Sequence, residues 1–122
     1  AVLDKAGIAP RWSRGLPPGT VARIRDYMLA HIGESISLEA LARVACMSRF
    51  HFARRFRQST GCSPMVFLLR MRIQRARCLL EEGESKIADI AAELGFFDQS
   101  HFTRTFRRTT GMSPRAYARS CT

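Results

Sequence analysis

The 122-residue sequence has no long apolar run and no closely paired cysteines. Although 46% of its residues are hydrophobic, no stretch approaches the roughly 18 consecutive apolar residues of a membrane-spanning helix. We therefore expect a soluble, intracellular chain that forms one compact domain or two small lobes. The absence of any C-x-x-C pair argues against a zinc knuckle or a dithiol redox motif and favours reduced thiols. The cysteines are Cys46, Cys62, Cys78 and Cys121.

Acidic residues are scarce and unevenly placed. The chain has 20 Lys and Arg against 10 Asp and Glu, which gives a formal net charge of +10. No acid occurs between Ala40 and Leu80, where there are nine arginines, and none follows Asp98. Such an excess favours a polyanionic partner. A basic face that is merely solvated has the same composition, so charge alone does not decide between the two.

An internal repeat of fifty residues favours the nucleic-acid interpretation. HFARRFRQSTGCSP at residues 51–64 matches HFTRTFRRTTGMSP at 101–114 in nine of fourteen positions without a gap. In each copy two phenylalanines four residues apart share one face of a helix, and Arg54 or Arg104 lies roughly opposite. We expect one face to be buried and the other free. The buried face contains Phe52 and Phe56 in the first copy and Phe102 and Phe106 in the second.

Each repeat also marks where its helices begin and end. Gly61 and Gly111 can adopt the left-handed conformation that closes a helix. A serine and a proline follow at 63–64 and 113–114, as the cap and the first residue of the next helix. The expected N-caps of the arginine-bearing helices are Ser48 and Asp98.

A short amphipathic helix is expected before each arginine-bearing helix, with a turn of three or four residues between them. This is the helix-turn-helix pattern, in which a residue near positive φ makes the turn. Gly95 suits that position, whereas the first unit has Cys46 there, at a cost on the order of 1 kcal/mol for a residue with a side chain. The apolar positions are Leu38, Leu41, Ala42 and Ala45 in the first helix, and Ile87, Ile90, Ala91 and Leu94 in the second.

The remaining segments connect and cover these units. Thr20 is expected to cap a first helix, and a last helix should run from Pro114 to about Arg119. The helix from Pro64 to about Glu81 should connect the lobes through one apolar stripe of Val66, Leu69, Ile73, Ala76 and Leu80. The expected organisation is a linker or flexible tail at 1–19, a first lobe at 20–62, a connector helix at 63–82 and a second lobe at 83–122.

Residues 37–80, followed by KIADIAAELGFFDQSHFTRTFRRTTGMSPRAY, resemble the AraC/XylS family of bacterial transcription regulators. The resemblance covers about Thr20 to Ala118. It implies an all-α, seven-helix, bundle-like module with two helix-turn-helix lobes joined by the long fourth helix. It also implies a transcription regulator, such as an activator, that binds double-stranded DNA in the bacterial cytoplasm at the nucleoid. RNA polymerase is a second expected partner, no cofactor is expected, and the Pro/Gly-rich start favours a fragment that lacks an N-terminal effector or dimerisation domain.

The same resemblance assigns base-facing positions. Because Ala53 is too short to read a base by hydrogen bonding, the first helix should read through Arg54, which can bond guanine bidentately, and through contact of Phe50 with a thymine methyl group. Packing of Phe50 against the connector helix is the alternative. The expected base-reading residues are Phe50, Ala53, Arg54, Gln99, Ser100, His101, Thr103 and Arg104, and the expected phosphate contacts are Arg49, Arg57, Arg107 and Arg108.

Two other functions stay open. One is an architectural DNA-binding or partner-binding module that uses its arginines without reading sequence. The other is an enzyme of DNA-alkylation repair, in which a similar segment accompanies a cysteine methyl acceptor. That chemistry needs an activated cysteine and a zinc-binding cluster. Since the sequence shows neither pattern, we expect no enzyme activity and no metal site.

Overall fold

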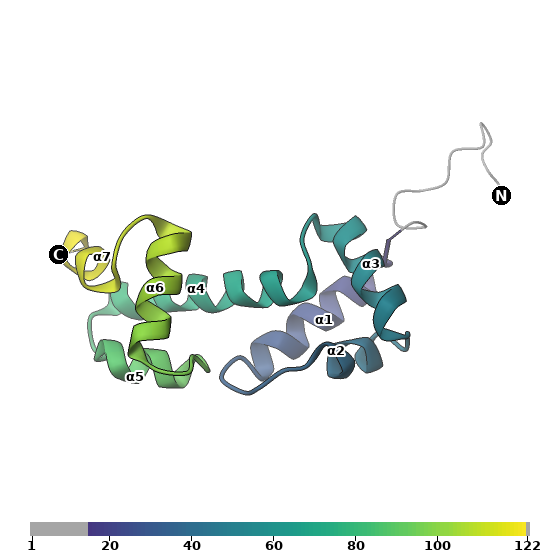
Figure 1. The fold of residues 1–122 in the computed structure, drawn as a ribbon, viewed down its shortest axis with the longest axis horizontal. Helices are drawn as coiled ribbons and strands as arrows, with labels where there is room; N and C mark the ends of the chain where they lie inside the picture. Colours follow the sequence, from purple (N-terminus) through teal and green to yellow (C-terminus); the bar gives the residue numbers. More distant parts are fainter. Residues whose placement is uncertain (1–14, 122) are drawn as a thin grey trace. The chain divides into compact units, whose positions relative to one another are not determined.

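Seven α-helices make up the regular structure of residues 15–121, the part of the chain that the computed structural model describes (Figure 1). This confirms the expected all-α, seven-helix architecture. Residues 1–14 of the predicted tail lie outside the described residues. The helices are α1 (Pro18–Ala30), α2 (Leu38–Val44), α3 (Arg49–Thr60), α4 (Pro64–Glu82), α5 (Ile87–Glu93), α6 (Gln99–Thr110) and α7 (Pro114–Ser120).

The described chain divides into two compact units. Unit 1 contains residues 15–30 and 36–67, and unit 2 contains residues 31–35 and 68–121. Residues 31–35, between α1 and α2, therefore belong to the second lobe, although the residues before and after them in the sequence belong to the first. The connector helix α4 begins in unit 1 and continues into unit 2.

Helix α1 begins earlier than the sequence predicts. Its first residue is Pro18, so Thr20 lies inside the helix and is not its cap. Proline suits the first helical turn because its missing N–H has no partner there in any case. Just before the helix, Leu16 is buried, and its amide donates a hydrogen bond of 2.7 Å to Ser59 Oγ on α3. This correction places residues 16–17 of the expected tail on the first lobe.

The core of unit 1 forms where α1 and α3 meet α2. Ile24 and Met28 on α1, Leu41 on α2, and Phe52 and Phe56 on α3 are all fully buried. The ring of Phe67, in the first turns of α4, meets Phe56 edge-on at 5.2 Å between centroids. The apolar periodicity of each helix thus becomes one shared core.

The core of unit 2 is built in the same way around α4. It contains one stripe of α4, the buried faces of α5 and α6, and Tyr117 of α7, whose ring lies 5.6 Å from that of Phe106. The predicted α4 stripe is wrong at Val66, which is exposed, while Leu68 is buried. Only from about Leu69 onwards does this stripe of α4 pack into the core of unit 2. Its buried members are Ile73, Ala76 and Leu80, together with Leu79.

Residues 31–35 are held on unit 2 by Arg72 and by a close backbone approach. Arg72 of α4 donates one hydrogen bond to Ile32 O at 2.9 Å and another to Glu34 O at 2.8 Å. A Cβ atom at Gly33 would lie only 2.2 Å from the carbonyl oxygen of Glu93. Glycine is therefore required where this segment crosses the end of α5.

Candidate nucleic-acid interface

The two helix-turn-helix turns have the same left-handed backbone conformation at matching positions, although the residues there differ. Cys46 has φ 57° and Gly95 has φ 80°, both in the left-handed region. In each turn the next amide returns to the short helix: Met47 N donates to Ala42 O, and Phe96 N donates to Ala91 O, both at 3.0 Å. The predicted turn positions are confirmed, including the one that lacks glycine.

The predicted ends of the two arginine-bearing helices are also confirmed. Ser48 Oγ accepts a hydrogen bond from His51 N at 3.3 Å, and Asp98 Oδ1 accepts one from His101 N at 2.8 Å. These side chains satisfy amides that have no partner inside the first helical turn. Both helices end at a left-handed glycine, Gly61 with φ 86° and Gly111 with φ 85°.

Paired phenylalanines orient both helices. Phe52 and Phe56 on α3 are fully buried with ring centroids 5.6 Å apart, and Phe102 and Phe106 on α6 are fully buried with centroids 5.7 Å apart. Their assignment to the core is confirmed. Because one face of each helix is anchored in this way, the opposite face is presented to solvent in the same rotational register.

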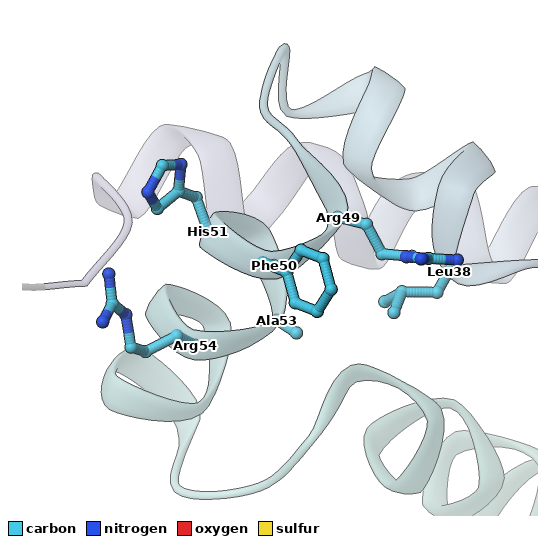
Figure 2. A pocket seen from close by; sticks show the side chains of 6 residues that line it. All are labelled: Leu38, Arg49, Phe50, His51, Ala53 and Arg54. Carbon is cyan, nitrogen blue, oxygen red and sulfur yellow. The ribbon is translucent and has the colours of Figure 1, made fainter.

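In the first lobe, the free face of α3 borders a surface hollow of ≈ 660 Å³. Phe50 is 78% exposed at this hollow, so its alternative placement against the connector helix is wrong. Figure 2 shows Phe50 and Arg49 extending towards Leu38 of α2, while Arg54 and His51 leave α3 on the other side. The hollow is lined by Leu38, Arg49, Phe50, His51, Ala53 and Arg54.

Arg49 is engaged within the protein. Its guanidinium bonds Glu39 of α2 at 2.6 Å, and its Cζ lies 5.4 Å from the centroid of the Phe50 ring. The pKa of the Glu39 carboxyl is lowered by a hydrogen bond at its own backbone and then by the bond from Arg49. Glu39 did not enter the sequence prediction. The available signal was an acid at the border of the acid-free block, ten residues before the arginine that begins the next helix.

In the second lobe, a hollow of ≈ 440 Å³ is lined by Gln99, Ser100, Thr103 and Arg104. These are four of the five base-reading candidates predicted on this helix. The fifth, His101, is turned away: its Nδ1 accepts a hydrogen bond from Phe97 N at 3.3 Å, and its ring meets Phe96 edge-on at 5.4 Å. His101 is therefore packed into the turn instead of lining the hollow.

Further cations lie at the ends of the same helices. Arg57 is in the last turn of α3, and Arg107 and Arg108 are in the last turn of α6; all three are exposed. Cations are favourable at the negative end of the helix dipole, and here they remain available to an anionic partner. Across residues 15–121, no three His, Cys, Asp or Glu side chains gather as they would around a metal ion. Every helix there is too short or too polar to cross a membrane.

Comparison with known proteins places this geometry among transcription regulators. The family described as "Helix-turn-helix domain" matches residues 41–120. Over 64 residues, 52% of this chain and 21% of the relative, the chain is 34% identical to the MmsAB operon regulatory protein of Pseudomonas aeruginosa. It spans 17–26% of the length of three of the curated relatives that it matches.

Two solved structures have the same fold. A transcriptional regulator from Chromobacterium violaceum, described as having an AraC-type DNA-binding domain, is 29% identical with a TM-score of 0.79 over 84% of this chain and 92% of that one. The DNA-binding domain of AdpA, solved in complex with a target DNA, is 36% identical with a TM-score of 0.77 over 83% of this chain and 91% of that one.

Proposed function

Because the chain belongs to the AraC/XylS family of DNA-binding helix-turn-helix domains, we propose that it regulates transcription by inserting α3 and α6 into adjacent major-groove segments of a specific site. The observation that supports this most directly is the matched pair of hollows, one in each lobe. Positions fifty residues apart line both of them: Phe50 with Ser100, Ala53 with Thr103, and Arg54 with Arg104. An α-helix fits the major groove, where every base pair has a distinct edge.

In the first lobe we assign base reading to Arg54 and Phe50. Arg54 is exposed and can donate two hydrogen bonds to guanine O6 and N7. The ring of Phe50 offers no hydrogen bond, so its natural target in the groove is the methyl group of thymine. Ala53 lies between them in the sequence. Its methyl side chain lets the helix come close to the bases but makes no hydrogen bond, which limits how many base pairs this helix can distinguish.

In the second lobe the four residues that line the hollow are all polar. Arg104 is suited to guanine, and the amide of Gln99 to adenine N6 and N7. Ser100 and Thr103 are both able to donate and to accept. His101 contributes by fixing the turn, since its ring is packed on Phe96. We therefore assign the greater sequence stringency to α6.

Affinity without sequence preference is assigned to the exposed arginines at the helix ends. Arg57, Arg107 and Arg108 are placed to neutralise phosphates, and each such contact releases counterions. We also propose that the parent protein carries a further effector or dimerisation domain; the greater length of the relatives, of which the chain spans 21% and 26%, supports this. RNA polymerase is the second partner that we propose for such a regulator.

Selection of bound duplexes from a random DNA library tests this function. The expected result is a site with two preferred segments, of which one carries more sequence information than the other. Recovery of no common sequence at moderate salt would instead favour an architectural protein that binds phosphates only. Equal information in both segments would contradict the assignment of greater stringency to α6.

A further inference from the structure

An ion pair between α2 and the first residue of α3 lies beside the exposed Phe50 ring of the first reading surface. Arg49 Nη1 lies 2.6 Å from Glu39 Oε2, and the guanidinium carbon lies 5.4 Å from the Phe50 centroid. The two charged side chains are each about half exposed, 50% for Arg49 and 53% for Glu39. The array therefore joins α2 to the first turn of α3 on the side that faces solvent.

The helix-turn-helix fold does not need this array. In the second lobe the positions that correspond to Glu39, Arg49 and Phe50 are Ala88, Gln99 and Ser100. The same two helices pack there although these three positions carry no charged pair and no ring, and the exposed ring of that lobe, Phe97, lies in the turn before α6. The repeat is thus an internal control: the array is an addition to the first lobe and not a condition for its fold.

The array is also costly for a surface that faces DNA. A carboxylate close to phosphates is repelled by them, and a guanidinium bonded to that carboxylate is less available to neutralise a phosphate. Hydrogen bonds at its own backbone and from Arg49 lower the pKa of the Glu39 carboxyl, in keeping with an ionic pair. The pair also places a cation beside the Phe50 ring. The separation is within the range of cation–π attraction.

We propose that the ion pair with Glu39 keeps Arg49 away from the DNA backbone and places its guanidinium where it holds Phe50 in its exposed position. The pair thereby determines how strongly the first lobe prefers thymine, whose methyl group Phe50 contacts, over a pyrimidine without that methyl group. Glu39 and Arg49 are then positioning residues that act through Phe50. This inference rests on the proposed function, since the first lobe must bind DNA for the preference to be observed. It replaces the phosphate contact that the sequence predicted for Arg49.

Replacement of thymine by uracil isolates the methyl group that Phe50 would contact. In the duplex recovered by selection, uracil is placed at each thymine in turn, and the dissociation constant is measured with the full chain. At the thymine read by Phe50, wild type should lose about fourfold in affinity, the value of one buried methyl group. The second measurement is the salt dependence of binding to a random duplex, which counts phosphate contacts.

Three variants separate the roles of the pair. Glu39→Gln should bind random DNA more tightly, with a salt slope steeper by about one contact, because Arg49 is released. Its thymine-to-uracil ratio should fall towards one. Arg49→Ala should lose the same discrimination while its salt slope stays unchanged. The matched control is Glu84→Gln, which removes the same charge from an exposed acid that pairs with no arginine within residues 15–121.

Several outcomes would overturn the inference. A shallower salt slope in Arg49→Ala would mean that Arg49 contacts a phosphate in wild type. Unchanged thymine discrimination in both Glu39→Gln and Arg49→Ala, with unchanged helix content by circular dichroism, would remove the positioning role. If wild type prefers a site but tolerates uracil everywhere, the inference fails while the proposed function stands. If wild type prefers no site, the proposed function fails, and the salt slopes on random DNA still test whether Arg49 is withheld.

Discussion

Cys46 adopts, with φ 57°, the left-handed backbone conformation that Gly95 adopts with φ 80° at the matching point of the second helix-turn-helix. A side chain in this region brings Cβ close to the following carbonyl oxygen, at a cost of roughly 1–2 kcal/mol, whereas glycine has no such contact. The first turn is nevertheless closed by the same hydrogen bond to the short helix as the second. The two turns therefore have the same geometry but carry different amounts of backbone strain.

This difference predicts opposite responses to substitution. Gly95→Ala should lower the free energy of unfolding by about 1–2 kcal/mol, and a Cβ there would lie 3.1 Å from the carbonyl oxygen of Gly33. Cys46→Gly should leave stability unchanged or raise it slightly, because relief of strain is partly offset by the greater freedom of the unfolded chain. Urea unfolding followed by circular dichroism measures both, with Cys46→Ala as the control. A large loss in Cys46→Gly would contradict this interpretation of the turn.

Arg72 should be a stabilising residue of unit 2. Its two bonds to the carbonyls of Ile32 and Glu34 involve a charged, half-buried donor, and such bonds contribute more than neutral ones. Arg72→Ala should lower the free energy of unfolding by roughly 2–3 kcal/mol. Arg75→Ala, an exposed arginine on the same helix, is the control and should stay within about 0.5 kcal/mol of wild type. Equal effects in thermal unfolding would show that the bonds to residues 31–35 contribute nothing.

Arg104 and Arg107 lie one turn apart on α6, and their replacement should affect DNA binding in different ways. Arg104→Ala should cost about 1–3 kcal/mol on the selected site and relax the preference at one base pair, because Arg104 lines the hollow. Arg107→Ala should weaken binding to all duplexes alike and lower the salt slope by about one. Titration of selected and random duplexes at several salt concentrations compares them. Equal losses on both duplexes for Arg104→Ala would remove its base-reading role.

Tyr117 should titrate above the ordinary tyrosine pKa of 10.0. Its hydroxyl donates a hydrogen bond to Glu81 Oε2, and the neighbouring carboxylate also disfavours the phenolate. Because the pKa is raised in the folded state, the contribution of this bond to stability is complete below pH 10.0 and is lost as the pH rises through the folded value. Tyrosinate absorbance in a Tyr27→Phe background measures it. Glu81→Gln should return the pKa towards 10.0, and no change there would exclude Glu81 as the cause.

The amino-acid order alone was enough to predict the local features of this protein. Helix ends depend on the residues that form them, so the caps at Ser48 and Asp98 and the closing glycines Gly61 and Gly111 were predicted correctly. The repeat predicted the buried phenylalanine faces, and with them the outward direction of Arg54 and Arg104. All of these follow from contacts within a few residues along the chain or from helical periodicity.

Long-range packing decided the rest. Which lobe holds residues 31–35 depends on Arg72 and on the approach of Gly33 to Glu93, which are about forty and sixty residues away along the chain. The burial of Leu16 depends on Ser59 in the same way. Helical periodicity places Arg49 on the solvent side, but only the position of Glu39 on the neighbouring helix shows that its charge is already paired. A periodic pattern defines the direction of a side chain from its own helix, whereas its partner is chosen by how separate helices pack.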